Sequence, residues 1–67
     1  MPTTSLFQTE PIAVCAEVLD FWLNECSADD APTAETVAQW CDIFTRRGGA
    51  FMRLAAECEH YLAESGA

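Results

Sequence analysis

Four cysteines and one histidine are the residues of this 67-residue chain that could bind a metal, form a disulfide or attack a substrate. Cys15, Cys26, Cys41 and Cys58 are separated by 11, 15 and 17 residues, and no C-x-x-C pair occurs. On one continuous helix, Cys15 and Cys26 would lie about 16 Å apart. That distance is too long for a shared zinc ion or a disulfide. We therefore expect no metal site, no cofactor and no disulfide framework.

The cysteines fit a structural role better than a reactive one. Each falls on the apolar side of a predicted helix, where a free thiol behaves as a small hydrophobic group. Such usage is typical of a reducing compartment, and we expect a cytoplasmic protein with reduced, mostly buried thiols. If the chain forms an antiparallel hairpin through Gly48-Gly49, then Cys41 and Cys58 are the two cysteines that lie nearest each other.

Catalysis would have to use Cys58 and His60, the only histidine. A cysteine nucleophile needs a base within hydrogen-bonding reach. Residues two apart on a helix point about 200° away from each other, so these two side chains do not face each other within one chain. We expect no enzyme, and we expect His60 to be exposed near Glu57 and Glu64. A thiol-based enzyme or sensor is the third of three functional hypotheses.

An arginine pair followed by two glycines, Arg46-Arg47-Gly48-Gly49, could hold an anion at the start of the next helix. Basic residues that end a helix before glycine are also ordinary C-cap composition, and this second reading is favoured.

Three segments have helical periodicity and capping residues, which predicts an all-α fold with helices near residues 10–26, 33–47 and 50–65. Thr9 and Thr33 are the expected N-caps. Residues 1–8 are expected to form a short N-terminal arm, and residues 9–67 a single three-helix domain. The apolar pair Leu6-Phe7 in the arm is expected to fold back over the core or to pack into a neighbouring subunit.

The first predicted helix is apolar over most of its circumference. Besides its core-facing residues it carries a second apolar row, Val14, Val18 and Phe21, which we call the outer stripe. Two short helices of one chain can cover only one side of it. The sequence therefore predicts a helical homodimer in which the outer stripe forms most of the interface.

The charge is strongly one-sided. Residues 1–45 hold eight carboxylates and no basic residue, and the formal net charge is −8. A chain of this kind repels polyanions, so direct binding to nucleic acid or to anionic lipid is not expected. The apolar run 11–23 is interrupted by Glu17 and Asp20 and predicts neither a signal peptide nor a membrane span.

The same charge favours a cationic protein as partner. The first hypothesis is a small non-catalytic regulator or inhibitor, of the kind that phages and mobile elements encode. It would dock an acidic face on a basic surface of a larger target, including a surface that otherwise binds nucleic acid. We call the residues of that face the acidic set: Glu17, Asp20, Asp29, Asp30, Glu35 and Asp42. The alternative is a structural or adaptor module. It would act through the apolar surface of the first helix that the chain itself does not cover, used as an oligomerisation or partner-helix interface.

Overall fold

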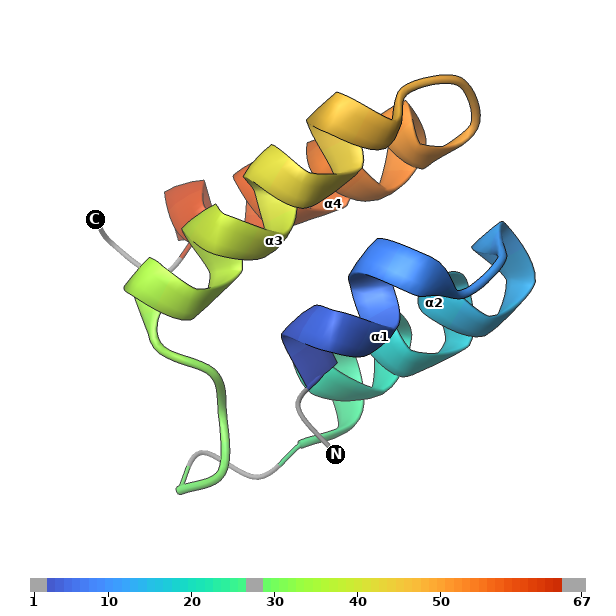
Figure 1. Cartoon of the computed structure of the whole chain (residues 1–67). Helices are drawn as coiled ribbons and strands as arrows, with labels where there is room; N and C mark the ends of the chain where they lie inside the picture. Colours follow the sequence, from blue (N-terminus) through green and yellow to red (C-terminus); the bar gives the residue numbers. More distant parts are fainter. Residues whose placement is uncertain (1–2, 27–28, 65–67) are drawn as a thin grey trace.

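The chain is described by a computed structural model that covers residues 3–26 and 29–64, and those residues contain helices and no strand (Figure 1). The all-α class is confirmed. The helical segments are α1 (Thr3–Thr9), α2 (Ile12–Asp20), the π-helix η1 (Phe21–Glu25), α3 (Ala34–Arg47) and α4 (Phe51–Glu64). They pack in two layers, with α1 and α2 in one and α3 and α4 in the other (Figure 1). None of the described helices is long and apolar enough to cross a membrane.

The N-terminal segment differs from the prediction, because residues 3–9 form helix α1 instead of an arm. A seven-residue helix is too short to be stable alone, so its contacts with the rest of the protein must hold it. Phe7 supplies most of them, since it is fully buried against Trp40 at 5.0 Å and Phe44 at 4.9 Å between ring centroids. Trp40 also donates a hydrogen bond through Nε1 to the Thr4 hydroxyl at 3.3 Å.

The first predicted helix begins two residues later than expected, and Thr9 is not its cap. Thr9 is the last residue of α1, and its hydroxyl donates to the Ser5 carbonyl at 3.1 Å. This hydrogen bond back to residue i−4 competes with capping of the next helix. Pro11 is the N-cap residue of α2 instead, with an extended backbone conformation.

The second half of the first predicted helix is a π-helix. The backbone continues without a break from Asp20 into η1, and the Cys26 amide donates to the Phe21 carbonyl at 3.0 Å, five residues back. Cys26 then turns to an extended conformation and ends the helix. Single π-helical turns often occur at functional sites. This one rotates Leu23 and Asn24 away from the positions that they would have in a continuous α-helix.

Helices α3 and α4 form the expected antiparallel hairpin. Thr33 caps α3 by accepting a hydrogen bond from the Thr36 amide, as predicted. Gly48 ends α3 with φ +68, a conformation that favours glycine. The predicted range 33–47 agrees with α3, and α4 spans 51–64 where 50–65 was predicted; residue 65 lies outside the described residues.

The core lies between the two layers and draws on all four α-helices. Its buried side chains are Phe7, Cys15, Leu19, Val37, Trp40, Phe44, Leu54, Ala55 and Cys58.

Arg47 connects the two layers at one end of the core. Its Nη1 donates to the carbonyls of Phe7 at 2.8 Å and Glu10 at 2.7 Å, and its guanidinium lies 4.0 Å from the ring centre of Phe51. The arginine thus satisfies carbonyls that the end of α1 leaves without a helical partner.

Candidate functional site

A groove runs along the seam where α2 and η1 lie against α4. It consists of two cavities that have Glu57 as a common lining residue. The larger has a volume of about 440 Å³ and is lined by Leu23, Asn24, Ala56, Glu57, His60, Tyr61 and Glu64. The smaller, of about 290 Å³, is lined by Ile12, Ala16, Ala50, Arg53, Leu54 and Glu57. We call the two together the α2–α4 groove.

Helices α2 and α4 run in the same direction (Figure 1). The start of α2, at Ile12, lies with Ala50 and Arg53, whereas η1 lies with Tyr61 and Glu64 near the end of α4. Both helices therefore begin at one end of the groove and finish at the other.

The floor of the groove is apolar, and its α4 edge is charged. Along that edge, Arg53, Glu57, His60 and Glu64 follow one another at intervals of four, three and four residues, which keeps them on one face of the helix. All four are exposed. His60 Nε2 lies 3.4 Å from a Glu64 carboxylate oxygen, and both side chains extend into solvent. The edge is thus basic at the start of α4 and acidic towards its end.

The α2 edge carries two members of the acidic set. Glu17 and Asp20 are exposed, and Asp20 accepts a hydrogen bond from the Asn24 amide at 2.7 Å. Asn24 itself lines the larger cavity. With about 100° per residue, these carboxylates lie between the groove-facing side of α2 and the outer stripe. Asp20, about 40° from Ala16 around the helix, is the one nearer the groove, and neither carboxylate lines a cavity.

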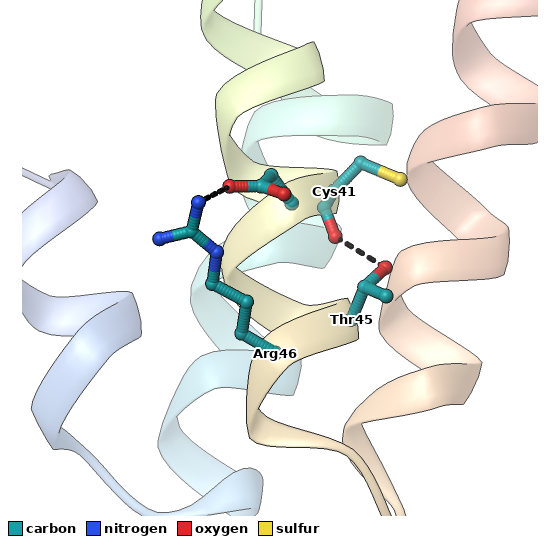
Figure 2. A network of polar contacts seen from close by, with 4 residues as sticks. Cys41, Thr45 and Arg46 are labelled. Atoms are coloured by element: carbon teal, nitrogen blue, oxygen red, sulfur yellow. Dashed lines mark hydrogen bonds and ion pairs between the residues drawn. The ribbon is translucent and has the colours of Figure 1, made fainter.

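The other members of the acidic set lie elsewhere. Asp29 and Asp30 are exposed in the connection before α3. Glu35 and Asp42 are exposed on α3, which contributes none of the described residues that line the groove. Asp42 also forms an ion pair with Arg46 at 3.0 Å, in which both side chains are exposed (Figure 2). The fold thus spreads the acidic set over α2, the connection before α3 and α3 itself.

The outer stripe is only partly covered by the chain itself. Val14 and Val18 are half-buried, and Val18 packs against the core. Phe21 is 48% exposed although its ring stacks edge-on against Trp22 at 5.5 Å. The apolar surface that was expected on this helix is therefore present in reduced form, because Val18 packs against the core and Trp22 covers part of the Phe21 ring.

Three of the thiols, those of Cys15, Cys41 and Cys58, lie where burial opposes their ionisation and raises the pKa. Cys58 is fully buried, and burial raises its pKa to about 12. Cys41 is half-buried, with its sulfur directed towards α4 and 3.6 Å from the Ala55 carbonyl (Figure 2). Burial, followed by the nearby Glu59 carboxylate, raises its pKa as well. Burial also raises the pKa of Cys15, against the opposing influence of Arg47. All four cysteines are free, and Cys26 is half-buried.

Sequence reasoning missed the α4 half of the groove. It treated Glu57 and Glu64 only as neighbours of His60. The seven-residue spacing of Glu57 and Glu64 was the available signal, because it places both carboxylates on one helix face. That this face lies beside α2 depends on tertiary packing.

The described residues hold no group of three or more His, Cys, Asp or Glu side chains placed to bind a metal ion. Comparison of the chain with protein-family models, with curated proteins and with solved structures found no match.

Proposed function

We propose that this protein is a non-catalytic binding module that docks an acidic surface on a basic surface of another protein. The observation that carries the proposal is the distribution of charge over the folded chain. Glu17, Asp20 and Glu35 are exposed, and within residues 3–26 and 29–64 they form no salt bridge. Carboxylates in that state remain available to cations of a partner.

The arginines do little to neutralise this surface. Arg47 is directed inwards, where it binds two carbonyls and stacks on Phe51. Arg46 is paired with Asp42 of its own helix. Two of the three arginines therefore make contacts within the chain, and in the part of the chain that the structure describes most of the carboxylates behind the net charge of −8 form no salt bridge.

Such a surface acts mainly on partner choice and on the rate of association. It attracts lysine- and arginine-rich surfaces and repels polyanions, so a target surface that otherwise binds nucleic acid suits it. A module of this kind would inhibit or regulate its target by occupying that surface.

Selection of peptide ligands tests the proposal without knowledge of the partner. The folded protein is the bait for a displayed library of random peptides of about 18 residues, long enough for five helical turns. A variant with six neutral replacements serves as the control bait: Glu17→Gln, Asp20→Asn, Asp29→Asn, Asp30→Asn, Glu35→Gln and Asp42→Asn. We expect lysine- and arginine-rich peptides to be enriched on the wild type and enriched much less on the control, which keeps only part of the negative charge. Enrichment of uncharged or acidic peptides, or of none, contradicts the proposal.

A second candidate function, self-association through the outer stripe, is favoured by the exposure of Phe21. A half-exposed aromatic ring beside two half-buried valines is the start of an apolar patch, and such patches mark interfaces. A homodimer that buries this stripe would leave the α2–α4 groove open. Sedimentation equilibrium at high micromolar concentration tests it, with Phe21→Lys as the variant that should dissociate the dimer. A monomer at that concentration rules the dimer out.

A further inference from the structure

We infer that the α2–α4 groove is the docking site for a basic amphipathic α-helix of the partner protein, bound antiparallel to α4. The inference rests on the proposed function and names the element of the partner that the acidic protein recognises. Three features of the groove carry it: its apolar floor, its length and the gradient of charge along its edges.

The groove has the shape that a third helix would fill. Two helices that run side by side leave a valley between their ridges, and an amphipathic helix can lay its apolar side chains into such a valley. The floor consists of the buried or half-buried apolar side chains among the lining residues, which are Ile12, Ala16, Leu23, Leu54 and Tyr61. Ala16 is small, so the backbone of an incoming helix can approach closely there.

The length also fits a helix. From Arg53 to Glu64 the α4 edge spans 11 residue steps, or about 16 Å along the helix axis. A partner helix of about 12 residues covers that distance. Its apolar residues would recur every three or four positions and enter both cavities.

The edges specify the charge of the occupant. Glu57 and Glu64 line the α4 side. On the other side the exposed Asp20 accepts a hydrogen bond from Asn24, which lines the same cavity, so basic residues of an incoming helix find carboxylates at both edges. Arg53 is the exception, at the end where α4 begins. The partner's basic residues should therefore concentrate over the Glu57 to Glu64 half.

The helix dipoles set the direction. Both η1 and α4 finish at the acidic end of the groove, so their partial negative charges add to those of the carboxylates. The N-terminus of a helix carries the opposite partial charge and is favoured at that end. The partner helix thus runs antiparallel to α4, with its basic half at its own N-terminus.

Nuclear magnetic resonance mapping locates the site. The basic peptide most enriched in the selection described above is titrated into ¹⁵N-labelled wild-type protein. We expect the largest amide shifts at groove residues of η1 and α4, and a helical bound peptide. If the largest shifts lie on the exposed face of α3, or if the bound peptide stays extended, the inference is wrong. The proposed function would still stand in that case, because the selection would have enriched basic peptides.

Two pairs of variants separate the groove from the rest of the acidic surface. Ala56→Trp fills the larger cavity, and Ala38→Trp places the same ring on the exposed side of α3 as its control. We expect Ala56→Trp to weaken binding of the peptide at least tenfold and Ala38→Trp to change it less than twofold.

Charge reversal repeats the comparison with exposed residues only. Glu57→Lys with Glu64→Lys should weaken binding at least tenfold, and Glu35→Lys with Asp42→Lys should weaken it much less. Equal effects of the two double variants contradict the groove as the site. If the selection enriches no basic peptide, the proposed function fails first, and the inference fails with it.

Discussion

Replacement of Arg47 by methionine should destabilise the protein far more than replacement of its neighbour Arg46. Arg47 donates to two carbonyls at 2.8 and 2.7 Å, and each hydrogen bond from a charged group to a carbonyl contributes about 1.5 kcal/mol at the low end of the usual range. Both come from one nitrogen of a partly exposed side chain, so we take about 1 kcal/mol for each. The contact with Phe51 adds about 0.5 to 1 kcal/mol.

The sum of about 2.5 kcal/mol is a large share of the stability of so small a domain. At 0.05–0.15 kcal/mol per residue, a chain of 67 residues has a free energy of unfolding of about 3 to 10 kcal/mol. For a domain of this size each kcal/mol corresponds to about 4–8 °C in Tm, so Arg47→Met should lower Tm by about 10 to 20 °C. The change would be measured by thermal and urea unfolding followed by circular dichroism.

Arg46→Met is the matched control. Arg46 forms only an exposed i,i+4 ion pair with Asp42, which is worth about 0.5 kcal/mol or less. Its removal should lower Tm by no more than about 4 °C. Equal shifts for the two variants would refute the role assigned to Arg47 in holding α1 on α3.

Three further outcomes are expected. A thiol reagent should label Cys58 slowly in the native protein at neutral pH and fully after denaturation, because the thiolate is the reactive form and burial raises the pKa to about 12; rapid native labelling contradicts this. Because the pKa of Cys58 is raised in the folded protein, its contribution to stability is fully present below about pH 9 and is lost as pH rises towards 12. Over that range the free energy of unfolding should therefore fall less steeply for Cys58→Ala than for the wild type. Phe7→Ala should cost about 3 to 5 kcal/mol and leave α1 undocked, measured by urea unfolding and amide exchange; a cost below about 1 kcal/mol contradicts the central position of this ring.

The all-α class and the α3–α4 hairpin could be predicted from sequence because their signals are local. Thr33 supplies a cap, Gly48 a helix end, and the residues between them an amphipathic face. By contrast, α1 has seven residues, too few to show periodicity, and owes its stability to contacts of Phe7 with residues more than 30 positions away. Thr9 carried a capping signal, but its hydroxyl bonds within α1.

The candidate site was predictable in part for the same reason. The clustering of Glu17 and Asp20 on one side of a helix follows from their spacing. The packing of their helix against the face of α4 that carries Glu57 and Glu64 does not follow from spacing, because the seam between the two helices depends on the tertiary fold. The π-turn that brings Asn24 to this seam had no recognisable sequence signal.

The central claim is that surface charge drives recognition of a basic partner. The most direct measurement is the association rate of the selected basic peptide, followed by stopped-flow fluorescence between 0.01 and 0.15 M salt. Over that range the Debye length falls from about 30 Å to about 8 Å, so the rate constant should fall by at least tenfold for the wild type. It should fall far less for the variant with six neutral replacements. A rate constant that is indifferent to salt and equal in the two proteins would show that the acidic surface serves solubility alone.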